Sequence, residues 1–174
     1  MAIEPDNQNW TWVLERQCSD CAFDAASVVP RDIGMTIRDI ASQWEVLLLH
    51  PEATKRPAEH VWSPSEYGCH VRDVFRLFDF RLELMLTEDD PMFPNWDQDE
   101  TAVSDRYDLQ DPLVVRRELA IAGDLLAERF DAVTAGDWLR TGLRSDGARF
   151  TVESFGRYLL HDPIHHLWDV SRTY

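Results

Sequence analysis

The chain has 174 residues, of which 44% are apolar, so it is long enough to bury one substantial core. Its 32 acidic and 17 basic residues give a formal net charge of −15. A surface of that sign repels nucleic-acid phosphates and anionic membranes, so we expect neither among the partners of this protein.

Neither a secretory signal nor a membrane span is predicted. The first ten residues, MAIEPDNQNW, lack a basic region followed by an apolar one. The longest apolar runs are far too short to cross a bilayer. The cysteines Cys18, Cys21 and Cys69 are an odd number in a chain that does not need disulfides to fold, so we interpret them as reduced thiols. These features predict a cytoplasmic protein.

The N-terminal part of the chain is irregular and is followed by a first helix. Residues 1–29 show no clear periodicity, and we expect Trp10, Trp12 and Phe23 to pack this part against the rest of the protein. From Pro30 to Leu49 the apolar residues recur at helical spacing, which predicts a helix.

The second helix has the clearest start in the sequence. Ser63 and Glu66 form a Ser-x-x-Glu capping box, and the helix should continue to about Leu86. From Thr87 to Gln110 the sequence is acidic and irregular, and two interpretations remain open. The segment is either a solvated acidic loop or a functional loop over a groove, in which the stretch PMFPNW would form an apolar wall.

Two more helices follow. Asp111 caps a third helix from Pro112 to about Phe130, and Thr151 caps a fourth that extends to about Val170. Between them, RTGLRSDGARFT is typical of an irregular hairpin or of a pair of short extended pieces. Four main helices with little strand signal predict an all-α fold, a four-helix bundle with an irregular N-terminal segment and a long acidic loop.

The last predicted helix carries three of the six histidines. His161 and His165 are four residues apart, so both rings can face one spot, which is a common way for a helix to bind zinc. His166 is rotated by about 100° from His165 and is not expected to reach the same ion. His70, on the second helix, is the natural third ligand. The alternative is that these histidines are ordinary structural or surface residues.

Pro163 lies between the two paired histidines and leaves two interpretations of this helix open. A proline inside a helix removes one backbone hydrogen bond, so the helix could bend between His161 and His165. Alternatively, the helix begins near Asp162 and leaves His161 outside it.

Two further features have more than one interpretation. The stretch CSDC, from Cys18 to Cys21, is half of a zinc site without a second Cys-x2-Cys pair. It represents a second metal site, a redox pair or two unremarkable thiols. Asp73 and Asp169, each one helical turn beyond a histidine, are either carboxylates that orient an imidazole or surface residues.

The segments WSPSEYGCHVRDV and HDPIHHLWDV resemble the two metal-bearing segments of the DinB/YfiT-like superfamily, whose members are four-helix bundles of similar length. In those proteins one histidine of the second helix and a His-x3-His pair of the last helix hold a divalent metal. Carried over by motif, the resemblance implies His70, His161 and His165 as metal ligands, and a single DinB-like helical bundle domain over residues 1–174.

The same resemblance implies a class of activity. Several members are thiol S-transferases that use bacillithiol, mycothiol or glutathione. Related bundles isomerise maleylpyruvate or form a domain of ergothioneine-synthesising enzymes. Other members have no known activity. The resemblance therefore implies a metal-dependent S-transferase that joins a low-molecular-weight thiol, similar to mycothiol or bacillithiol, to an electrophile. A metal with an open position can deprotonate such a thiol at neutral pH.

The resemblance leaves alternatives open for the function and for the metal. A non-catalytic, metal-binding or stress-associated bundle and a thiol-dependent isomerase are the alternative functions. Zinc is the expected metal, with nickel, iron and manganese as alternatives. No catalytic residue is identified by motif, and a symmetric homodimer is consistent with the family.

Overall fold

The computed structural model describes residue 3 and residues 8–172. Most of the stretch from Met1 to Asn7, where no signal peptide is expected, lies outside the described residues. Within the described part of the chain, each helix is too short or too polar to cross a membrane.

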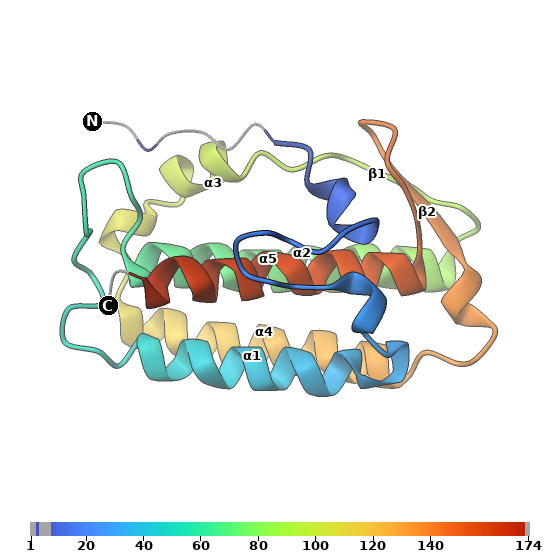
Figure 1. The fold of residues 1–174 in the computed structure, drawn as a ribbon, viewed down its shortest axis with the longest axis horizontal. Coiled ribbons are helices and arrows are strands. Elements are labelled where there is room, and N and C mark those ends of the chain that lie inside the picture. Colours follow the sequence, from blue (N-terminus) through green and yellow to red (C-terminus); the bar gives the residue numbers. More distant parts are fainter. Residues whose placement is uncertain (1–2, 4–7, 173–174) are drawn as a thin grey trace.

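Four long helices form a bundle, as the sequence predicts (Figure 1). They are α1 (Ile33–Leu47), α2 (Pro64–Thr87), α4 (Pro112–Asp131) and α5 (Val152–Ser171). Helix α4 packs against α1 and α2, and α5 contacts the same two helices from the other side of the bundle. The prediction of a four-helix bundle is confirmed.

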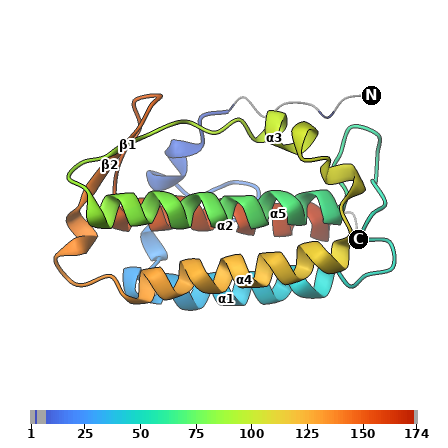
Figure 2. The same ribbon diagram turned by 180° about the vertical axis from the view of Figure 1, so that it is seen from behind.

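The order of the helices requires one long connection. Helices α2 and α4 are neighbours and run in the same direction, so the chain has to return along the length of the bundle between them (Figures 1 and 2). This crossing segment, residues 88–111, passes over the side of α2 and α5 and carries the short helix α3 (Gln98–Ser104). The N-terminal segment, residues 8–29, contacts α5 and passes in front of it in Figure 1 before it reaches α1.

The crossing segment is more regular than its sequence suggests. It contains strand β1 (Met92–Phe93) and the 3-10 turn η4 (Tyr107–Leu109). Strand β1 pairs in parallel with β2 (Thr141–Arg144), which forms the predicted hairpin with the antiparallel strand β3 (Arg149–Thr151). Phe93 and Tyr107 are buried in the core, so the segment is anchored at both ends and is not a solvated loop throughout.

The remaining short elements are 3-10 turns. They are η1 (Trp10–Leu14), η2 (Ala25–Ser27), η3 (Pro30–Asp32) and η5 (Asp137–Leu139). The first two give the N-terminal segment its local structure, and η3 leads directly into α1.

A buried capping box fixes the start of α2. The Ser63 hydroxyl accepts a hydrogen bond from the Glu66 amide, and the Glu66 carboxylate accepts one from the Ser63 amide at 2.9 Å. Burial alone would raise the pKa of Glu66, but the hydrogen bonds from Arg56 and Ser63 outweigh it and lower that pKa. The carboxylate therefore stays ionised inside the protein and holds the first turn of α2, one turn before His70.

Helix α5 continues without interruption through Pro163. Thr151 and Ser154 form its capping box, and the Trp44 indole donates a hydrogen bond to the Pro163 carbonyl at 3.4 Å. His161 is therefore inside the helix, and the interpretation in which the helix begins near Asp162 is wrong.

Close packing between α1 and α4 depends on Gly34. A Cβ atom at this position would lie 2.8 Å from the Ala127 carbonyl oxygen and would also overlap the Asp131 carboxylate. We expect Gly34→Ala to lower the free energy of unfolding by about 1–3 kcal/mol, the usual cost of overpacking. Urea denaturation followed by circular dichroism measures this change.

Gly136→Ala is the matched control, because a Cβ atom there meets nothing within 4 Å. Equal stability of the two variants would contradict the close helix contact.

Candidate metal centre

Helix α5 presents two pairs of metal-binding side chains, offset by one residue. One pair is His161 and His165, and the other is Asp162 and His166. Because consecutive helical residues are rotated by about 100°, the two pairs face different neighbours. Each pair is completed by side chains from elsewhere, and within each group the ligand atoms lie within 4.8 Å of one another.

The first group joins His70 of α2 to Asp162 and His166. His70 is fully buried, and its Nε2 lies 3.2 Å from Asp162 Oδ1. The rings of His70 and His166 meet edge to face with 4.9 Å between their centroids. Trp96, from the crossing segment, stacks on His70 at 5.4 Å and an interplanar angle of 9°. The crossing segment therefore covers one face of this ligand.

Electrostatics keep the carboxylate of this group charged. Burial would raise the pKa of Asp162, but the nearby His70 and His166 lower it to about 2. On the outer side, His166 Nδ1 lies 3.0 Å from Asp169 Oδ2, so this carboxylate orients the imidazole. Asp73 instead accepts hydrogen bonds from Tyr107 and Arg72. Of the two carboxylates considered from the sequence, Asp169 is the one that contacts a histidine.

The spacing of these donors fits a divalent cation. Two ligands ~2.1 Å from a tetrahedral ion are about 3.4 Å apart. The His70 Nε2 atom lies 3.2 and 3.4 Å from the two Asp162 oxygens, and Asp162 Oδ1 lies 4.0 Å from His166 Nε2. Two imidazoles and one carboxylate leave a coordination position available, as in catalytic zinc sites.

The second group joins His161 and His165 to Cys18 and Cys21 of the N-terminal segment. The Cys18 Sγ atom lies 3.7 Å from His165 Nδ1, and the two histidine rings are 5.1 Å apart. Burial, and then the nearby His165, lower the pKa of His161 to about 4. Burial also lowers the pKa of His165 and raises that of the Cys21 thiol to about 11. Both imidazoles are thus neutral near pH 7 and can donate a lone pair to a metal.

Aromatic side chains enclose this second group. The centroids of Trp10, Trp12 and Phe23 lie 5.2, 6.3 and 5.6 Å from that of His161. The expectation that these three residues pack the N-terminal segment against the bundle is confirmed.

The three histidines predicted as ligands are divided between the two groups. His161 and His165 lie together, whereas His70 lies with Asp162 and His166. A single ion held by His70, His161 and His165 stays a prediction. Sequence reasoning placed His166 outside the site and did not consider Asp162, although the i, i+4 spacing of these two residues was visible.

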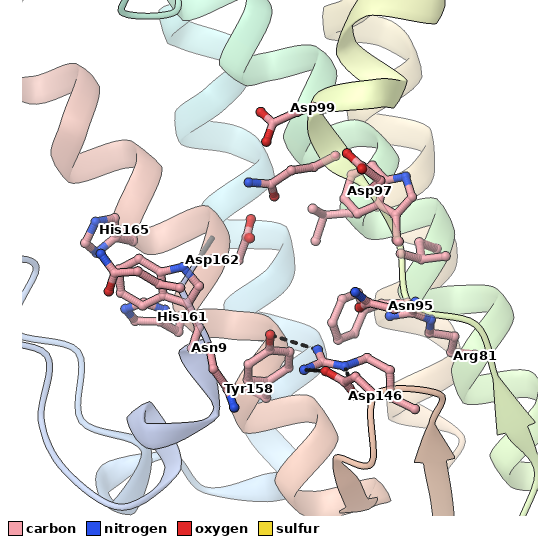
Figure 3. A pocket seen from close by; sticks show the side chains of 18 of the residues that line it. Asn9, Arg81, Asn95, Asp97, Asp99, Asp146, Tyr158, His161, Asp162 and His165 are labelled. Carbon is pink, nitrogen blue, oxygen red and sulfur yellow. Dashed lines mark hydrogen bonds and ion pairs between the residues drawn. The ribbon is translucent and has the colours of Figure 1, made fainter. Parts of the chain in front are cut away.

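A pocket of about 560 Å³ borders both groups (Figure 3). His161, Asp162 and His165 lie on one side of it, and Arg81 lies on the opposite side. Of the stretch PMFPNW, Asn95 and Trp96 line this pocket, whereas Met92 is exposed and Phe93 is buried in the core. Of the three apolar residues predicted to form a wall, Met92, Phe93 and Trp96, the tryptophan alone lines this pocket.

Arg81 gives the pocket a buried positive charge. It is 3% exposed and donates a hydrogen bond to the Pro94 carbonyl at 2.6 Å. Its Nε has no hydrogen-bond partner, and Arg81 has no ion pair within the part of the chain that the structure describes. Burial and the nearby Arg144 lower its pKa to about 10, so it stays charged at neutral pH. Such a guanidinium is suited to binding an anionic group.

Comparison with known proteins agrees with this fold. The solved structure of YfiT from Bacillus subtilis, described as a probable metal-dependent hydrolase with an unusual four-helix bundle topology, is similar with a TM-score of 0.72. The two chains are 17% identical, and the match covers 84% of this chain and 89% of that one. Among curated proteins, none matches the chain. The sequence model of the DinB superfamily matches residues 46–170, and the chain therefore belongs to the DinB superfamily.

Proposed function

We propose that this protein is a metal-dependent S-transferase that joins a low-molecular-weight thiol to an electrophile. The observation that supports the proposal is the group of His70, Asp162 and His166, which offers three donors among the described residues and borders a pocket of about 560 Å³. Protein zinc sites with four ligands are usually structural, and those with three usually catalytic.

The residues around this group have distinct roles in the proposal. A divalent metal held there, with zinc first and nickel, iron or manganese as alternatives, would supply a Lewis acid that favours the thiolate form of a bound thiol. Asp162 contributes a charged ligand, and Asp169 fixes the tautomer and orientation of His166. Trp96 limits the access of water to His70.

In the proposal, Arg81 binds an anionic group of the substrate, separate from the reacting atom near the metal. Since it lies across the pocket from the ligands, a thiol or an electrophile that carries a carboxylate could place that group on the guanidinium and its reacting atom near the metal. Mycothiol-like or bacillithiol-like thiols are the class implied by the family resemblance. The proposal places the protein in the cytoplasm, where such thiols stay reduced.

Variants of the ligands test the site. We expect His70→Ala, Asp162→Asn and His166→Ala each to remove one metal ion per chain, measured by elemental analysis of purified protein, because each loses one of three donors. The exposed His50 provides the control, and His50→Ala should keep the metal content of the wild-type protein.

One result would reverse the assignment of the ligands. If Asp162→Asn and His166→Ala retain all metal, while His161→Ala and His165→Ala lose the same ion as His70→Ala, the set of His70, His161 and His165 is the correct one.

A pH–rate profile tests the chemistry. With metal bound, thiol conjugation should persist at pH 7, well below the free-thiol pKa of ~8.5, because the thiolate is favoured at the metal. The metal-stripped protein should follow the titration of the free thiol. Identical profiles with and without metal would favour a non-catalytic metal-binding bundle. Metal-dependent hydrolysis of esters without thiol conjugation would favour a hydrolase. Metal-dependent turnover of a thiol adduct without conjugation would favour an isomerase.

Substitution of Arg81 tests the anionic group. We expect Arg81→Met to raise KM for a carboxylate-bearing substrate by about tenfold or more, since a charge-assisted hydrogen bond contributes roughly 1.5–3 kcal/mol. The effect should vanish with the methyl ester of the same substrate. Arg117→Met, an exposed change on α4, is the control, and an equal change in KM for acid and ester would exclude the contact.

A further inference from the structure

The side chains of the second group come from two distant parts of the sequence. Cys18 and Cys21 have Cys-x2-Cys spacing in the N-terminal segment, and His161 and His165 have His-x3-His spacing on α5. We propose that these four residues form a second metal site, a closed Cys2His2 zinc site that fastens the N-terminal segment to the last helix.

The donor atoms already have the spacing that zinc needs. Zinc binds thiolate sulfur at ~2.3 Å and imidazole nitrogen at ~2.1 Å, so sulfur and nitrogen donors of a tetrahedral site are about 3.6 Å apart. The Cys18 Sγ atom lies 3.7 Å from His165 Nδ1, and all four donors lie within 4.8 Å of one another. Small side-chain movements would bring them around one ion.

A buried nitrogen points to a missing partner. His161 is 3% exposed, and its Nε2 has no hydrogen-bond partner in the described part of the chain. An unpaired buried polar atom costs about 1–3 kcal/mol. The neighbouring Cys18 is 1% exposed, so solvent does not offer an alternative partner at that side. A metal ligand bond to His161 would remove this cost.

The backbone holds the two thiols on the same side of a tight turn. The Cys18 amide donates to the Phe23 carbonyl at 2.8 Å, and the Ala22 amide donates to the Cys18 carbonyl at 3.1 Å. Ala22 adopts a left-handed φ of 60°, which closes the turn after Cys21. The two sulfur atoms are thereby presented together to α5.

This site differs in chemistry from the group of His70, Asp162 and His166. Two thiolates and two imidazoles are typical of structural zinc, and four protein ligands leave no position for a substrate. Cys18 and Cys21 also lie outside residues 46–170, the part that matches the family model. The inference does not require the S-transferase activity, although it does require that His161 and His165 bind a different ion from His70.

The proposed zinc site would have a structural role, because it would hold the N-terminal segment and Trp10 against α5. The Trp10 ring lies 5.2 Å from the rings of both His161 and His165, and Trp10 also lines the large pocket. Zinc bound between the N-terminal segment and α5 would keep this wall of the pocket closed. Its loss would release the segment without removing the ligands of the other group.

Cobalt binding to the full chain tests the site directly. The reduced, metal-stripped protein is titrated with Co²⁺, and we expect a near-ultraviolet sulfur-to-cobalt absorption band that added Zn²⁺ abolishes. Cys18→Ser and Cys21→Ser should each lose or strongly weaken this band. Cys69→Ala should keep it, because Cys69 is buried on α2 and belongs to neither group. Absence of the band in the wild-type protein would overturn the proposal.

Alkylation of the wild-type protein provides a test that does not depend on the folding of variants. With Zn²⁺ bound, mass spectrometry of peptides should show slow alkylation of Cys18 and Cys21, and a chelator should restore fast alkylation. His70→Ala should keep this protection, which separates the site from the proposed catalytic one. Alkylation that is unaffected by Zn²⁺, or a Cys18–Cys21 disulfide that forms equally with and without it, would refute the site.

Discussion

The period of the α-helix is the constraint on which this site depends. Two donor pairs offset by one residue on α5 cannot face the same direction, since each step along a helix rotates the side chain by about 100°. The pair of Asp162 and His166 meets His70 on α2, whereas His161 and His165 meet the thiols of the N-terminal segment. One stretch of six residues thus contributes to two candidate ligand groups of different chemistry, on two different faces of a single helix.

The topology of the bundle brings two irregular segments of the chain against α5 and α2. Because α2 and α4 are parallel neighbours, the crossing segment has to run back along the bundle, and it does so on the side of α2 and α5 (Figure 1). Trp96 from this segment stacks on His70, and Trp10 from the N-terminal segment packs on His161. The two irregular parts of the chain therefore each contribute a wall to the pocket, and α2 and α5 supply the rest of its lining together with the hairpin.

The charges that line the pocket are mixed. Asp97, Asp99, Asp146 and Asp162 line it together with Arg81 and Arg144, and Arg144 forms an ion pair with Asp146. The net charge of −15 would repel an anionic substrate at long range, but the buried guanidinium of Arg81 and a cation bound at the candidate metal centre would attract it at short range. Arg81 without a carboxylate partner costs stability, and ligand binding would offset that cost. In the proposed function, Arg81 is the group that would bind an anion inside the pocket.

The sequence by itself determined the four long helices and their approximate limits, because capping boxes such as Ser63 with Glu66 and the helical spacing of apolar residues are local signals. It did not indicate the short helix α3 in the crossing segment. It also determined that His161 and His165 lie together, since that contact is set within one helix. Only the tertiary structure decided that Asp162 and His166 face His70, and that CSDC lies against α5. These contacts depend on the rotation of α5 about its axis and on the path of the N-terminal segment, which are set by packing between residues distant in the sequence.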